Sequence, residues 1–199
     1  LKSPLMILSG MAENLKENVH TEKREYYAEE MLKNIADMNR MIEQSLGFSK
    51  LSQTERLGKK IEVDMRAQTD ALLRKYKELV ESRGQHISVT GEGQMRGNEA
   101  MLRQMVDNLL QNAILHGEED GQIQIIVGNG TYRIRNTYTG SLTTEDAKKL
   151  LKPYAKEEDR KRTGGHGLGL SIVHEIVKLH RGKLELNVED AVFEVSVRL

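Results

Sequence analysis

Four of the six residues from 164 to 169 are glycine, in the stretch GGHGLGLSIV (164–173), and an apolar run follows directly. Ordering glycine costs more conformational entropy than ordering any other residue, so such a cluster needs a physical reason. Either the segment is a flexible hinge, or its backbone must approach a group that a Cβ atom would keep away. The glycines precede a predicted helix, whose first N–H groups and partial positive charge favour anions such as phosphate.

A second unusual pattern lies in DNLLQNAILHG (107–117), about fifty residues earlier in the chain. Asn108, Asn112 and His116 recur at every fourth position, so they share one face of a predicted helix that is otherwise apolar. Amide oxygens are suitable ligands for Mg²⁺, which commonly shares its coordination with phosphates and water. A solvated polar stripe is the alternative interpretation. Amides flanked by so many apolar residues need a partner, which favours a binding site.

Composition excludes several classes of protein. Thirty basic residues balance thirty acidic ones, so no net charge favours nucleic acid or an anionic membrane, and we expect neither as a partner. The chain has no cysteine, which excludes disulfides and cysteine zinc sites. No apolar stretch approaches the length of a membrane span.

Residues 1–54 have the pattern of two helices. Apolar residues follow steps of three and four on either side of the break ENVHTEK (17–23), at Leu1, Leu5, Leu8, Ala12 and Leu15 and then at Ala28, Met31, Ile35, Met38 and Ile42. This spacing predicts an antiparallel helical hairpin with a coiled-coil seam. Two thin helices cannot bury both faces, so we expect a second copy to complete a four-helix bundle. Packing of the hairpin on the rest of its own chain is the alternative.

Residues 55–199 are predicted to form a second domain, an α/β sandwich with about three long helices on one face of mixed strands. The polar segment LSQTERLGKK (51–60) is predicted to be a linker. Asp64 and Asn98 are expected to cap helices. Strands are expected at 60–64, 86–91, 122–127, 131–136, 183–188 and 192–199, and helices at about 65–84, 98–117 and 170–182.

Three motifs in order carry a resemblance to a known family. NLLQNAILHG resembles the N-box and GGHGLGLSIV the second glycine box of sensor histidine kinases in the GHKL ATP-binding superfamily. The opening LKSPLMILSGM is similar to the end of the family's H-box, in its dimerisation and histidine-phosphotransfer helices. The resemblance implies an α+β chain: the hairpin at 1–54, then an ATP-binding sandwich of the Bergerat type at 55–199.

The resemblance also implies a site for ATP and Mg²⁺. Asn112 matches the asparagine that ligates Mg²⁺, with Asn108 one turn earlier helping to hold the metal and the phosphates. His116 matches a residue beside the base or ribose. The implied ATP-binding set is Asn108, Asn112, His116, Asn136, Gly140, Lys156, Arg160, Gly165, His166, Gly167, Leu168 and Gly169.

Several positions depart from the family pattern. The aspartate that accepts a hydrogen bond from the adenine amino group is Asn136 here, in NTYTG (136–140). Tyr138 replaces the first glycine of that box and Gly140 is the second; the alternative is a local shift of register, with Gly140 as the first glycine. Asn136 keeps an acceptor oxygen. Leu115 stands where the family commonly has a basic residue. The stretch KEEDRKRTGG (156–165) matches the mobile ATP lid, where Lys156 or Arg160 either contacts phosphate or is simply solvated.

The resemblance implies the cytoplasmic core of a membrane-associated sensor kinase, acting as a homodimer. The γ-phosphoryl of ATP would pass to a histidine expected two positions before Leu1, and then to an aspartate of a response-regulator receiver domain. Ser3 matches the position that orients water in dephosphorylation of the regulator; an ordinary helix serine is the alternative.

Two other functions remain open. The eroded aspartate box and Leu115 suit a catalytically weak pseudokinase that acts as a dimeric scaffold. A GHKL ATPase of the mismatch-repair or topoisomerase type would place a glutamate base four residues before the metal-binding asparagine. That position is Asn108, which cannot accept a proton, and this favours transfer over hydrolysis.

Overall fold

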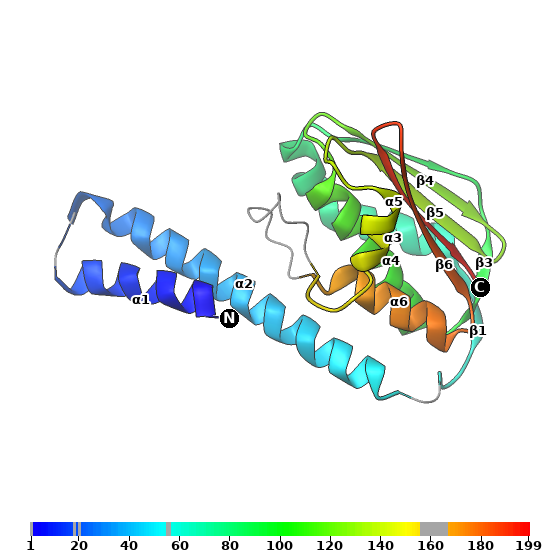
Figure 1. Cartoon of the computed structure of the whole chain (residues 1–199), viewed down its shortest axis with the longest axis horizontal. Helices are drawn as coiled ribbons and strands as arrows, with labels where there is room; N and C mark the ends of the chain where they lie inside the picture. Colours follow the sequence, from blue (N-terminus) through cyan, green and yellow to red (C-terminus); the bar gives the residue numbers. More distant parts are fainter. Residues whose placement is uncertain (1, 18, 20, 55–56, 156–166) are drawn as a thin grey trace. The chain divides into compact units, whose positions relative to one another are not determined.

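The computed structural model describes residues 2–17, 19, 21–54, 57–155 and 167–199 (Figure 1). The chain divides into two compact units, Leu1–Gly47 and Phe48–Leu199. Among the described helices, none combines the length and the apolar character needed to cross a bilayer.

The first unit consists of helices. It contains α1 (Lys2–Lys16), the short 3₁₀ helix η1 (Thr21–Lys23) and most of α2 (Arg24–Ser52). Both figures show α1 alongside the first half of α2, with the two helices running in opposite directions. The residues predicted to form one apolar stripe on α2 differ in exposure. Met31 and Met38 are half-buried, whereas Ile35 and Ile42 are 44% and 43% exposed.

The second unit is built on a five-stranded sheet in the order β2-β4-β5-β7-β6. Strand β2 pairs with β4 in parallel, and every other pair is antiparallel. A separate two-stranded sheet pairs β1 with β3. The strands are β1 (Ile61–Asp64), β2 (His86–Thr90), β3 (Gln94–Gly97), β4 (Gln122–Gly128), β5 (Thr131–Thr137), β6 (Lys183–Glu189) and β7 (Val192–Arg198).

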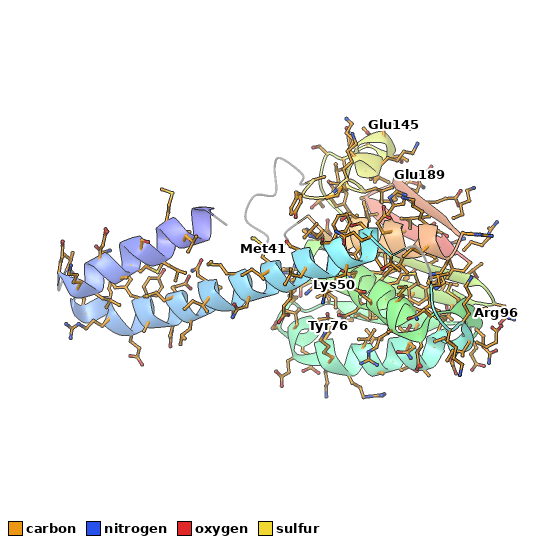
Figure 2. All side chains as sticks on the ribbon, turned by 90° about the horizontal axis from the view of Figure 1, so that it is seen from below. Met41, Lys50, Tyr76, Arg96, Glu145 and Glu189 are labelled. Carbon is orange, nitrogen blue, oxygen red and sulfur yellow. The ribbon has the colours of Figure 1, made fainter. Side chains whose placement is uncertain are left out.

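Three long helices, α3 (Met65–Ser82), α4 (Glu99–His116) and α6 (Gly169–Leu179), lie on one face of the large sheet (Figure 1). Side chains along β4, β5 and β7 alternate between buried and more exposed, as expected for a sheet covered on one face. Helix α4 runs between α3 and α6 and packs against both (Figure 2). Its buried residues form the centre of the core.

The predicted α+β class is present, and the predicted strands and caps are found close to their expected places. Asp64 and Asn98 accept hydrogen bonds from Ala67 N and Met101 N, as N-caps of α3 and α4. Helix α2 runs to Ser52, into the segment expected to be a linker from residue 51. Its last turn belongs to the second unit because Leu51, 6% exposed, packs in that unit's core.

Two elements were not predicted. Strand β3 has four residues and no apolar alternation, and it is held by pairing with β1 about 35 residues away. Helix α5 (Thr144–Lys149) is short and begins with a capping box between Thr143 and Asp146. The hydrogen bonds from Lys149 and Thr143 lower the pKa of the Asp146 carboxyl to about 2.

Candidate functional site

The carboxamide of Asn108 lies between α4 and α6. Its Nδ2 donates to the carbonyl of Gln104 at 2.8 Å, and the residue is 9% exposed. Only the N–H end can donate to a carbonyl, so this bond fixes the orientation of the amide. Oδ1 accepts no hydrogen bond from the described residues and faces α6, where a Cβ built on Gly169 would lie 3.5 Å from it. The structure therefore brings Asn108 to the glycine cluster.

Asn112 and His116 follow on the same face of α4. Asn112 is half-buried and makes no hydrogen bond with the part of the chain that the structure describes. Its amide is one helical turn, about 6 Å along the axis, from that of Asn108. His116 is the last residue of α4 and is half-buried.

The N-terminus of α6 has no side-chain cap, whereas α3, α4 and α5 are each capped by their own side chains. Leu168 stands at the N-cap position, and its side chain is completely buried in the core. Leu168 therefore anchors the helix and offers only its backbone to a ligand. The first N–H groups of α6 receive no hydrogen bond from the side chain of Leu168, which is a suitable arrangement for an anion.

Gly167 is the one glycine of the described part of the cluster that the backbone itself requires. Its φ is +68°, and a Cβ there would collide with the carbonyl of Ala155 and the backbone of Tyr154. Gly167 O also accepts a hydrogen bond from Tyr154 N at 2.9 Å. The backbones on the two sides of the segment 156–166 are thus held together.

Asn136 lies on β5, on the face covered by helices, and is 5% exposed. Its Nδ2 donates to the carbonyl of Thr137 at 2.9 Å, and Oδ1 has no partner among the described residues. A Cβ built on Gly117, the C-cap of α4, would lie 3.5 Å from Asn136 Nδ2. Like Asn108, Asn136 has its N–H end bound and its oxygen available.

Tyr138 accounts for the altered glycine box. Its ring is buried and packs against Phe193 with the ring centroids 6.2 Å apart. The phenol oxygen accepts a hydrogen bond from Leu142 N at 3.2 Å and lies over Gly140, where a Cβ would collide with it. Glycine is required at 140 because the ring of Tyr138 fills that space.

Several predicted residues lie outside the described residues: Lys156, Arg160, Gly165 and His166. Ser3 is within α1, and only its backbone is described.

Two residues that support the site were missed by sequence reasoning. Gln85 donates through Nε2 to the carbonyls of Ile114 and Glu118, which holds the C-terminal turn of α4. His180, the C-cap of α6, joins this helix to the start of α4 by accepting a hydrogen bond from Asn98 N. Neither partner is near in sequence, so no local pattern could have revealed them.

The residues present fit a magnesium ion. Asn108 and Asn112 would offer hard amide oxygens, the ligand type that Mg²⁺ prefers alongside phosphate oxygens. Such an ion would neutralise charge on the phosphates. The cradle of backbone N–H groups at α6 would face the same phosphates.

Comparisons with known proteins indicate the family of the chain. Residues 97–199 match the family described as "Histidine kinase-, DNA gyrase B-, and HSP90-like ATPase". The chain is 28% identical over 183 residues to "Probable sensor protein PcoS" of Escherichia coli, covering 87% of this chain and 39% of that protein. It is 26% identical over 191 residues to "Signal transduction histidine-protein kinase BaeS" of Escherichia coli, covering 92% of this chain and 41% of that one.

Solved structures show the same fold. The Acinetobacter baumannii histidine kinase AdeS superposes with a TM-score of 0.77 at 19% identity, over 100% of this chain and 95% of that one. Histidine kinase ThkA, in complex with response regulator protein TrrA, gives a TM-score of 0.72 at 18% identity, over 99% of this chain and 58% of that one.

The chain spans about two fifths of the length of the two curated relatives named above. The family match covers more than half of this chain, and it includes α4, Asn136 and the described residues of the glycine cluster. The chain therefore belongs to the histidine kinase-, DNA gyrase B- and HSP90-like ATPase family, and it is similar to the catalytic core of sensor histidine kinases.

Proposed function

We propose that this core binds Mg·ATP and transfers the γ-phosphoryl group to a histidine that precedes residue 1. The observation that carries the proposal is the position of Asn108 Oδ1 against Gly169. Two segments about sixty residues apart in sequence meet there. One offers side-chain amide oxygens, and the other offers backbone N–H groups beside glycine. A metal-bound triphosphate needs both kinds of group.

The base would lie at the C-terminal end of α4 and the phosphates near the middle of the helix. Asn136, beside the C-cap Gly117, would accept a hydrogen bond from the adenine amino group through its free Oδ1. Asn108 lies about 13 Å farther back along the helix, at the start of α6. His116, at the C-terminal end of α4, would lie beside the base or ribose, and Gly140 in the loop after β5.

Transfer requires little covalent chemistry from the chain itself. The bond between the γ-phosphorus and the β,γ-bridging oxygen breaks, a bond to an imidazole nitrogen forms, and ADP leaves. Positioning and charge neutralisation dominate such a reaction. The amides of α4, the N-terminus of α6 and the cations Lys156 and Arg160 would supply both, with Gly165, His166 and Gly167 beside the phosphates.

The first unit would provide the dimer and the docking site for a response regulator. Apolar side chains on α2 remain exposed within one chain, at Leu32, Ile35, Ile42 and Leu46. We propose that a second copy covers this stripe in a four-helix bundle. A receiver domain would then accept the phosphoryl group on the cytoplasmic side of the membrane, and Ser3 would act in its dephosphorylation.

A dimeric scaffold with weak catalysis is the second candidate. The observation that favours it is Tyr138, whose buried ring takes the place of a family glycine. A plain ATPase is less well supported, because the glutamate base of such enzymes is replaced by Asn108.

The test uses the protein extended at its N-terminus to include the preceding histidine, incubated with γ-labelled ATP and Mg²⁺. We expect acid-labile phosphate on that histidine, lost in Asn112→Ala and retained in Gln111→Ala, a matched change one position away on α4. Label absent from a protein that binds Mg·ATP would favour the scaffold. Release of labelled phosphate without a labelled protein would favour the ATPase.

A further inference from the structure

The imidazole of His180 connects α4 and α6 at the end of the helix pair that lies away from the candidate site. Nε2 accepts a hydrogen bond from the backbone N–H of Asn98 at 3.1 Å, and Nδ1 lies 2.7 Å from the carbonyl of Ile176. Since Nε2 accepts, it carries a lone pair, and Nδ1 must carry the hydrogen that is donated to Ile176. The bonding pattern thus requires a neutral ring in a single tautomer.

The surroundings of the ring are built to hold it. A Cβ on Gly97 would lie 2.5 Å from Nε2 and 2.7 Å from Cδ2, so glycine at 97 is what gives the ring its place. Asn98, the residue that the ring holds, is the N-cap of α4. Its Nδ2 also donates to the carbonyl of Leu57 at 3.0 Å. The ring of His180 therefore holds the N-cap residue of α4 through a hydrogen bond from its backbone N–H.

Two of the contacts between α4 and α6 are spaced by nearly the same distance along both helices. The helices run antiparallel, with Asn108 at Gly169 and Asn98 at His180. At a rise of about 1.5 Å per residue, the contacts are separated by about 15 Å along α4 and about 16 Å along α6. If one helix slid along the other, the hydrogen bond between Asn98 and His180 would break. The same movement would displace Asn108 from the N-terminus of α6.

We propose that His180 is a positioning residue for nucleotide binding, which clamps the start of α4 to the end of α6 and so sets Asn108 and Asn112 against the glycine cluster. This inference rests on the proposed function. His180 lies too far along both helices to touch the nucleotide, so it acts only through their register.

Protonation would release the clamp. Burial lowers the pKa of His180, the bond to Ile176 O opposes this, and the charge of Lys60 adds to the lowering. From α4 the ring faces the backbone of Asn98 and from β3 that of Gly97, neither of which titrates. Lys60, before β1, is the charged group that acts on it. A proton on Nε2 would oppose the N–H of Asn98, so the clamp holds only in the neutral form.

The test compares Mg·ADP affinity by titration calorimetry at pH 7.5 and pH 5.5 in the wild type, His180→Gln and His180→Leu. Glutamine offers one acceptor and one donor and does not titrate. We expect His180→Gln to bind within about threefold of the wild type at pH 7.5, and His180→Leu to bind about tenfold more weakly, because Asn98 N loses its acceptor. From pH 7.5 to 5.5 the wild type should lose more affinity than His180→Gln, by less than about tenfold, which is the limit for an imidazole of ordinary pKa.

The comparison separates the possible failures. Titration of ADP itself affects every variant equally, so it cancels in the ratio to His180→Gln. Equal pH profiles in the wild type and His180→Gln, with equal affinity in His180→Leu, would overturn the positioning role while leaving the proposed function intact. A wild type that does not bind Mg·ADP would overturn both.

Gly97→Ala provides a second route if His180→Leu does not fold. The added methyl group would press on the ring from β3 without removing any titrating group. We expect weaker Mg·ADP binding at pH 7.5 and a flatter pH profile than in the wild type. Wild-type binding in a folded Gly97→Ala protein would contradict the clamp.

Discussion

The oxygen of Asn108 lies opposite Gly169, at the distance of an ordinary van der Waals contact from the place where a side chain would begin. The nitrogen of the same amide is bound to its own helix, which leaves the oxygen as the only group that can act on a ligand. This pair of residues, from helices joined by a long stretch of chain, defines the centre of the candidate site.

Removing the Asn108 oxygen should weaken metal-dependent binding without unfolding the protein. In Asn108→Leu an apolar side chain of similar size replaces an amide whose oxygen has no partner in the described part of the chain. We expect Mg·ADP affinity to fall at least about tenfold. The free energy of unfolding, from urea denaturation without nucleotide, should change by less than about 1.5 kcal/mol. Gln104→Ala, on the adjoining turn, is the matched control; unaltered affinity in Asn108→Leu would contradict the assigned role.

The two glycines at 167 and 169 should respond to alanine in opposite directions. Gly167 has a positive φ and backbone neighbours that leave no room for a Cβ, so Gly167→Ala should destabilise the protein by about 1–3 kcal/mol. Gly169 is in helical conformation with space for a methyl group, so Gly169→Ala should stabilise it by about 0.4–1 kcal/mol. Urea denaturation measures both. A Gly169→Ala protein that is more stable yet binds Mg·ADP less tightly would show that this glycine serves the ligand.

Stability should decrease on acidification through His180. Its pKa in the folded protein is lowered, mainly by burial, below the ordinary value of about 6.5. As the pH falls, the unfolded chain therefore takes up a proton before the folded one, and the free energy of unfolding declines below about pH 7 and is constant above it for this group. The difference between the wild type and His180→Gln in urea denaturation isolates this term. A difference that does not vary between pH 7.5 and pH 5.5 would show that His180 is not the group responsible.

A charge on the exposed stripe of α2 should dissociate the proposed dimer. Ile35 is 44% exposed within one chain and is expected to be covered by the second copy. Ile35→Glu would bury a carboxylate without a partner, so the association constant should fall at least about tenfold. Lys33→Glu introduces the same residue on a side chain that is 70% exposed and should leave association nearly unchanged. Sedimentation equilibrium distinguishes the two; a wild type that is monomeric at micromolar concentration would refute the interface.

The sequence by itself determined the elements of this protein and the chemical character of its site. Helix periodicity, strand alternation and the caps Asp64 and Asn98 are local patterns, because the hydrogen bonds that they encode join residues a few positions apart. The amide stripe at 108, 112 and 116 and the glycine cluster are also local patterns, and together they favoured phosphate and metal binding over a solvated stripe and a hinge.

Only the tertiary structure decided which end of each amide is available and what holds the two segments together. Asn136 presents its oxygen because the neighbouring carbonyl of Thr137 takes its nitrogen in the folded strand. The clamp between His180 and Asn98 joins residues 82 positions apart. Strand β3 is held by its pairing with β1, which lies at least 30 positions earlier in the chain. Such bonds depend on the packing of distant elements, and no pattern within a short stretch of chain specifies them.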